Sequence, residues 1–147
     1  EDFARANMKE ILEVLDKEGM IELKSETAMS VWIENLGNGK FTIHELPCEA
    51  QMAPINTIEC LDIDEDGNMD LLIGGNEYQA EVSAGRFDAS YGLLLKGLGK
   101  GKLMAVSPVR SGFILDGNVK HIRKIHNQAG KISILVGINN DSLRVFR

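Results

Sequence analysis

The sequence is poor in several features that would place it in a special class. It has only 3 prolines, 1 tryptophan and 2 cysteines, and aromatic residues make up 5% of its 147 residues. No apolar run approaches the roughly 18 residues of a membrane-spanning helix. Basic residues number 16 against 22 acidic ones, and the net charge of −6 argues against a nucleic-acid partner. Hydrophobic residues still make up 44%, which is typical of one folded globular domain and excludes disorder.

Familiar catalytic and phosphate-binding motifs are also missing. The sequence contains neither Gly-x-Ser-x-Gly nor His-Glu-x-x-His. His44, His121 and His126 lack metal-ligand spacing, and the glycines of 97–102 match no phosphate-binding loop. Nothing in the sequence points to an enzyme, although a pair of carboxylates can be assembled from distant segments.

The two cysteines and the first residue assign no cellular location. Cys48 and Cys60 flank a loop with alanine and proline, so they either pair or act as small buried hydrophobes. The sequence begins with Glu1 rather than Met, as expected for a mature product or an excised segment.

Segment 1–29 is predicted to be helical. Its apolar residues follow the one-sided stripe of an amphipathic helix: Ala4, Met8, Ile11, Leu12 and Leu15. Gly19 is a suitable helix end. Because a lone helix of this length is marginal in water, we expect the stripe to pack on the protein or to bind a partner.

The remainder reads as short strands between glycine turns. The expected strands are 31–33, 41–46, 57–61, 69–73, 93–95, 103–106, 119–125, 132–136 and 143–146. Between the first two, Asn38-Gly39 is a favoured type I′ hairpin turn, and Trp32 is expected in a core or between blades.

An internal repeat relates the two halves of this β region. The stretch 36–41 (LGNGKF) recurs as 98–103 (LGKGKL), and 71–76 (LLIGGN) recurs as 134–139 (ILVGIN). Each unit holds four strands, which is the content of a β-propeller blade. We therefore expect a mainly β fold of about two blade-like units, 30–91 and 92–147, the latter ending with the start of a further strand. Because propellers need at least about four blades, this piece would leave open sheet edges for further blades or for self-association.

The most specific motif is an acidic loop. Residues 62–70 read D-x-D-x-D-G-x-x-D, with carboxylates at Asp62, Asp64, Asp66 and Asp70. Gly67 permits a sharp turn, and the carbonyl of Asn68 adds a further oxygen. Such an oxygen-rich loop predicts a Ca²⁺ site rather than Mg²⁺, which prefers to keep several waters. The equivalent stretch 125–131 has no carboxylate, so we expect one site.

This loop, followed by Leu71-Leu72-Ile73-Gly74, resembles the FG-GAP/VCBS repeat, which builds the β-propellers of integrin α-subunits and of many secreted bacterial proteins. The stretches 49–51 (EAQ) and 85–90 (GRFDAS) add to the likeness. Residues 31–147 look like the closing blades of bacterial VCBS-repeat proteins related to the cartilage-acidic-protein group. Residues 1–29 resemble a helical insertion before such blades.

The resemblance implies an extracytoplasmic scaffold stiffened by calcium, which is secreted, periplasmic or at the cell surface. It carries the calcium ligands over to Asp62, Asp64, Asp66, Asn68 and Asp70. The expected function is a non-enzymatic module for protein or carbohydrate recognition. The alternative is part of a glycan-active enzyme, to which this segment contributes loops of a larger propeller site.

A second candidate site lies in the long connection 76–91. Tyr78, Glu81, Arg86 and Asp88 offer an apolar ring and charged groups that would suit a glycan or a peptide. The alternative is a structural loop in which Arg86 pairs with Asp88 or Glu81.

Overall fold

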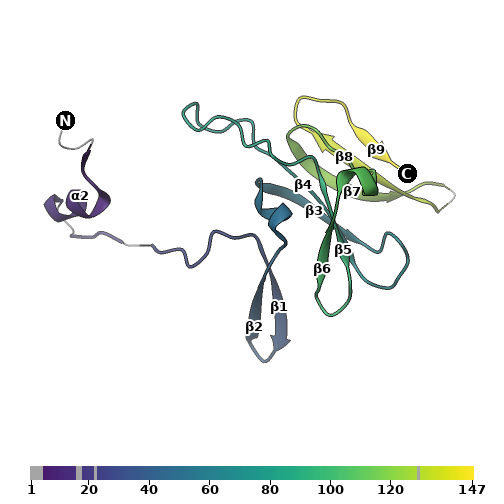
Figure 1. Ribbon diagram of the computed structural model, residues 1–147, viewed down its shortest axis with the longest axis horizontal. Coiled ribbons are helices and arrows are strands. Elements are labelled where there is room, and N and C mark those ends of the chain that lie inside the picture. The colour runs from purple at the N-terminus through teal and green to yellow at the C-terminus, as the bar shows by residue number, and fades with distance from the viewer. Residues whose placement is uncertain (1–4, 16–17, 22, 129) are drawn as a thin grey trace.

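The computed structural model describes residues 5–15, 18–21, 23–128 and 130–147. Over these residues the protein is mainly β, with nine strands in three antiparallel sheets and few helices (Figure 1). The strands are β1 (Val31–Gly37), β2 (Lys40–Glu45), β3 (Ile55–Leu61), β4 (Asp70–Gly75), β5 (Leu93–Gly97), β6 (Leu103–Val106), β7 (Val119–His126), β8 (Ile132–Ile138) and β9 (Arg144–Phe146). The helices are α2 (Met8–Val14), the 3₁₀ turn η1 (Cys48–Gln51) and α3 (Pro108–Ser111). None of the helices described is both long and apolar enough to cross a membrane.

Helix α2 is shorter and more exposed than the sequence predicts. Asn7 and Glu10 form a reciprocal capping box that fixes its start, and the helix ends at Val14, before Gly19. None of its residues is buried, and Figure 1 shows it apart from the sheets. The expected packing of the apolar stripe is therefore not seen, and its first member, Ala4, lies outside the described residues.

Each of the nine predicted strands is present, with ends that differ by a few residues. The first two form a separate hairpin, and the next four form a meander in the order β3-β4-β5-β6. The last three form a sheet in the order β7-β8-β9. Strand β4 is covered on both faces, which explains its continuous apolar sequence rather than an alternating one.

The internal repeat is reproduced in three dimensions. In the β1–β2 hairpin Trp32 pairs with His44, and in β5–β6 the equivalent Leu94 pairs with Val106. The turn residues also correspond: Asn38 and Gly39 have φ of 52° and 73°, and Lys100 and Gly101 have 52° and 70°. Positive φ at both central residues is what a type I′ turn requires. The β3–β4 and β7–β8 pairs even share a register shift at the same place.

The sheets divide the strands differently from the sequence repeat. The complete four-stranded sheet spans residues 55–106, so it crosses the expected division between 30–91 and 92–147. Each repeat unit instead supplies the last two strands of one sheet and the first two of the next. Over the described residues, the first sheet thus has two strands and the third has three, compared with four in the second.

Two apolar cores lie between successive sheets. The first core includes Leu46, Ala50 and Leu95, with Trp32 packed against it. The ring of Trp32 passes so close to Gly101 that a Cβ there would meet it at 2.5 Å. Trp32 is therefore a residue between sheets, as the sequence suggested.

The second core joins the second and third sheets. Its fully buried members include Leu115, Ile122 and Val136. At the strand edges, the hydroxyl of Thr57 accepts the backbone N–H of Ile122 at 3.1 Å. The side-chain amide of Asn56 donates to the carbonyl oxygens of Asn76 and Val119, at 2.7 and 2.9 Å. These bonds fix β7 against β3 and β4.

The repeat provides a matched test of this sheet contact. A Cβ on Gly74 would lie 2.5 Å from Val119 Cγ1, whereas one on the equivalent Gly137 would meet nothing closer than 3.8 Å. We expect Gly74→Ala to lower the free energy of unfolding by about 1–3 kcal/mol through overpacking. Gly137→Ala should change it by no more than about 0.5 kcal/mol. Equal effects in denaturant unfolding would contradict the observed sheet contact.

Candidate functional site

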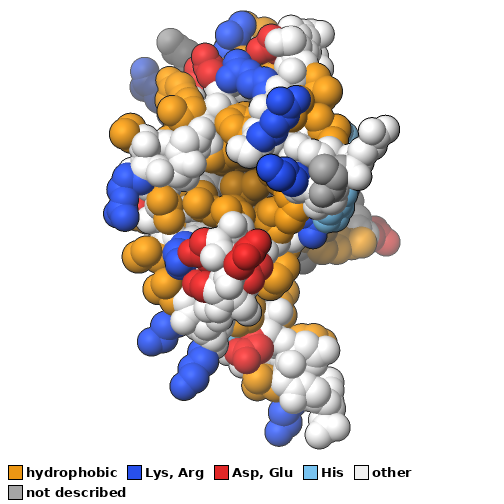
Figure 2. All heavy atoms as spheres, turned by 90° about the vertical axis from the view of Figure 1, so that its right-hand side faces the viewer, with side chains coloured by type: hydrophobic (Ala, Val, Ile, Leu, Met, Phe, Trp, Pro, Cys, Tyr) orange, Lys and Arg blue, Asp and Glu red, His pale blue; other side chains and the backbone are white. Residues whose placement is uncertain are grey.

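The acidic loop joins β3 to β4 and is organised by its own backbone. Glu65 and Gly67 have positive φ, 59° and 85°, so the chain turns sharply there. The N–H groups of Asp66 and Gly67 donate to the carboxylate of Asp62 at 3.1 and 2.9 Å. On the face shown in Figure 2, acidic side chains form a compact group below a band of hydrophobic side chains. Hydrogen bonds within the loop thus hold it in a tight turn.

Asp70 anchors the loop to the sheet. Its side chain is buried, with 2% exposure, at the first position of β4. One carboxylate oxygen accepts the buried N–H of Gly97 at 2.8 Å, and the other accepts the N–H of Ile63 at 3.0 Å. The carboxylate therefore ties the loop to the end of β5.

Three carboxylates converge on one point. One oxygen from each of Asp62, Asp64 and Asp70 lies within 4.8 Å of the others. Ca²⁺ binds oxygen at about 2.3–2.6 Å, so donors on opposite sides of the ion are about 4.6–5.2 Å apart. The three oxygens therefore have the chemistry and the separation that a hard divalent cation needs.

The two other predicted ligands are engaged differently. The carboxylate of Asp66 accepts both the backbone N–H and the side-chain amide of Asn68, at 2.8 and 3.0 Å. The backbone bond is the main reason why the pKa of Asp66 is lowered, and Lys96 lowers it further. Asp66 and Asn68 thus lie in the loop but outside the group of three converging acids.

Lys96 is a neighbour of the acidic loop that the sequence did not reveal. It pairs with Asp64 and, at 3.3 Å, with Asp66. The bond to Asp64 is the largest cause of its raised pKa. The register of β4 and β5 explains its position. Leu71 pairs with Leu95 in this antiparallel pair, so Lys96 lies level with Asp70 at the start of β4. An ammonium thus already neutralises part of the acidic loop.

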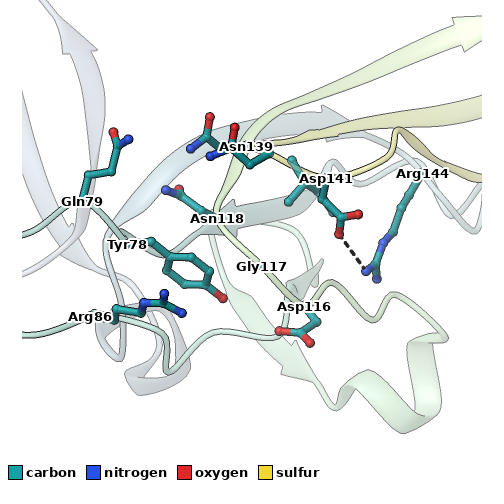
Figure 3. Close-up of a pocket in the computed structure, with 11 residues that line it drawn as sticks. Tyr78, Gln79, Arg86, Asp116, Gly117, Asn118, Asn139, Asp141 and Arg144 are labelled. Carbon is teal, nitrogen blue, oxygen red and sulfur yellow. Dashed lines mark ion pairs between the residues drawn. The ribbon is translucent and has the colours of Figure 1, made fainter.

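A polar cavity of about 490 Å³ lies at the opposite end of the same strands (Figure 3). The connection 76–91 brings Tyr78 and Arg86 to it, with the guanidinium 4.8 Å from the ring centroid. Glu81 and Asp88 do not line it, and Arg86 forms no ion pair with any described residue. The structure therefore brings together two of the four residues suggested for a ligand.

The other walls come from the third sheet, and sequence reasoning missed them. Asp116, Gly117 and Asn118 precede β7, while Asn139 and Asp141 follow β8. Asp141 pairs with Arg144 at 3.5 Å. The only sequence signal was the repeat itself, which aligns Asn139 with Asn76.

Glu77 links the cavity wall to the third sheet. Its carboxylate pairs with Lys120 at 2.9 Å and accepts the N–H of Gln79 at 2.8 Å. The pKa of Glu77 is lowered, chiefly by the Gln79 N–H and then by Lys120. The carboxylate is therefore more stable ionised in the folded protein.

The histidines and the cysteines considered in the sequence analysis lie outside both candidate sites. His44 stacks on Trp32 with ring centroids 4.2 Å apart and bonds to Glu34 at 2.9 Å. Cys48 and Cys60 are both free and exposed, so they neither form the possible disulfide nor act as small buried hydrophobes. A hydrogen bond to Glu49 is the main cause of the raised pKa of the Cys48 thiol.

Asp70 should be structurally essential even without metal. In EDTA, we expect Asp70→Ala to lower the free energy of unfolding by about 1–3 kcal/mol. The substitution leaves the backbone N–H groups of Ile63 and Gly97 without an acceptor. Asp64→Ala serves as the control, since it removes only an exposed carboxylate paired with Lys96. Urea unfolding measures both, and a similar small loss in the two variants would refute the anchoring role.

Glu77 should make stability pH-dependent. Folding lowers its pKa below the ordinary 4.5, so its stabilisation is present above that pH and is lost as the pH falls through the lowered value. Glu77→Gln should therefore lower the melting temperature at neutral pH, and the difference from wild type should shrink in acid. Glu81→Gln, in the same connection, should show no such difference. A gap independent of pH would contradict this assignment.

No protein-family model, curated protein or solved structure matches this chain. A function is therefore inferred from the acidic loop and the polar cavity themselves.

Proposed function

We propose that the chain is a calcium-binding, β-propeller-type repeat module without enzymatic activity, which serves recognition and scaffolding outside the cytoplasm. The observation that carries this proposal is the convergence of Asp62, Asp64 and Asp70 within 4.8 Å. The ion would be structural, because the loop connects two adjacent strands of one sheet.

Calcium fits this loop better than magnesium. The converging donors are all carboxylates, one of them buried, and Asp66 and the Asn68 carbonyl lie in the same tight turn. Ca²⁺ accepts six to eight oxygens in a flexible geometry, whereas Mg²⁺ demands a near-ideal octahedron and keeps waters. A multidentate loop of this kind therefore favours the larger ion.

The sheet pattern supports a propeller segment. Three sheets follow one another through two cores, and the repeat runs through them in register. The incomplete first and third sheets leave edges that remaining blades of a longer chain, or a second copy, would cover. Exposed apolar residues on β1 and β2, such as Ile33 and Ile43, mark one such surface.

A location outside the cytoplasm suits the metal loop. Extracellular calcium modules work with dissociation constants of about 10⁻⁴–10⁻³ M, which intracellular calcium would leave empty. The resemblance to secreted and surface propeller repeats agrees with this location. The ligand would be a protein or a carbohydrate.

A thermal melt in EDTA and in millimolar CaCl₂ tests the metal assignment. At about 10 mM Ca²⁺ such a site should stabilise the fold by roughly 1–3 kcal/mol, because only the folded loop binds the ion. Asp64→Asn and Asp66→Ala should remove the shift. Glu65→Gln is the matched control, since Glu65 belongs to the same loop but is neither in the converging group nor among the predicted calcium ligands.

A substitution of Lys96 gives a second test in the same calcium melt. Because its ammonium pairs with Asp64 and Asp66, a metal ion must displace it. Lys96→Met should therefore strengthen calcium binding and enlarge the shift. A wild-type protein whose melting temperature ignores calcium, with Lys96→Met equally indifferent, would contradict the proposed function.

A further inference from the structure

Asn118, one of the residues that line the polar cavity, has a buried acceptor atom without a partner. Asn118 is 1% exposed, and its Oδ1 is the one buried side-chain nitrogen or oxygen atom without a hydrogen bond among the described residues. Its Nδ2 faces a carboxylate oxygen of Glu77 at 3.4 Å. Because a carboxylate only accepts, this contact fixes the amide orientation and leaves Oδ1 as the free atom.

The missing partner must be a hydrogen-bond donor. An unpaired buried acceptor is costly, so a group that fills the cavity and donates to Asn118 would gain affinity there. Gln79 and Asn139 line the same cavity, and their side chains make no hydrogen bond to a described residue. Figure 3 shows the amides of Asn118 and Asn139 on the same wall of the cavity. A hydroxyl suits such a wall, since it donates to one amide and accepts from another.

The charges around the cavity favour a neutral ligand. Two cations, Arg86 and Arg144, are balanced by two carboxylates, Asp116 and Asp141. A charged ligand, whether cationic or anionic, would therefore meet both attractive and repulsive groups and gain little net electrostatic attraction. The ring of Tyr78 adds an apolar surface, and the volume falls within the range of about 300–1,000 Å³ for small-molecule sites.

The repeat shows that part of the cavity wall is an addition to the sheet. The connection between β4 and β5 is long, whereas β8 and β9 are joined by residues 139–143 alone. Because both connections join equivalent strands, the sheet does not need the extra length that carries Tyr78 and Arg86. Added loops on a rigid scaffold commonly carry binding residues.

We propose that this cavity binds a short neutral saccharide, whose hydroxyl groups bond to Asn118, Asn139 and Gln79 while a sugar ring lies near Tyr78. The inference rests on the proposed recognition function and names its ligand class and site. The site is independent of the metal loop, which lies at the other end of β4.

The test is a printed array of neutral and acidic oligosaccharides and short peptides, probed with the full chain in calcium buffer. Calorimetric titration of the best-bound neutral tetrasaccharide then gives its affinity. Tyr78→Ala and Asn139→Ala should each weaken binding at least tenfold, because the first removes the apolar ring and the second an amide of the cavity wall. Arg110→Ala is the matched control, because Arg110 is exposed on α3 and does not line the cavity. Backbone and side-chain amide NMR spectra should show the Asn118 amide among the most shifted signals.

Four outcomes would overturn the proposal: no saccharide binding, preference for acidic saccharides, preference for peptides, or full affinity in both cavity variants. The calcium melt of the same protein separates the two ideas. A normal calcium shift without saccharide binding would refute only the saccharide site. Saccharide binding at the cavity without a calcium shift would refute only the metal assignment.

Discussion

The close packing of the third sheet on the second, at Gly74, is the contact on which the rest of the structure depends. With no side chain at Gly74, Val119 and Ile122 reach the second sheet, and Asn56 and Thr57 then bond to the backbone of β7. This contact sets the segment before β7 beside the connection that follows β4, which creates the polar cavity. The acidic loop forms at the other end of the same strands. One packed pair of sheets therefore positions both candidate sites.

The acidic loop balances carboxylate repulsion in two ways. Backbone N–H groups satisfy Asp62 and Asp70, and the Lys96 ammonium lies against Asp64 and Asp66. Four carboxylates still face one monovalent cation, so the loop keeps a net negative charge. A divalent ion would remove more of that repulsion than Lys96 does, and this difference is the physical basis of the calcium proposal.

Local patterns predicted the parts of the structure that local forces determine. The strands followed from short apolar runs between glycine turns, the hairpin from Asn38-Gly39, and the acidic loop from its spacing. Contacts between distant residues were beyond such patterns: Lys96 reaches the loop only through the register of β5, and Asn118 reaches the cavity only through sheet packing. The apolar stripe correctly predicted the helix α2. Periodicity does not reveal which surface packs against a helix, and none of the residues of α2 is buried. The repeat predicted the matching hairpins, while the grouping of strands into sheets needed the structure.

Calorimetric titration of Ca²⁺ into EDTA-treated protein tests the central claim most directly. The account predicts one ion per chain, with Mg²⁺ binding more weakly, and no binding to Asp64→Asn. A chain that takes up no calcium, or that binds it unchanged after this substitution, would contradict the account.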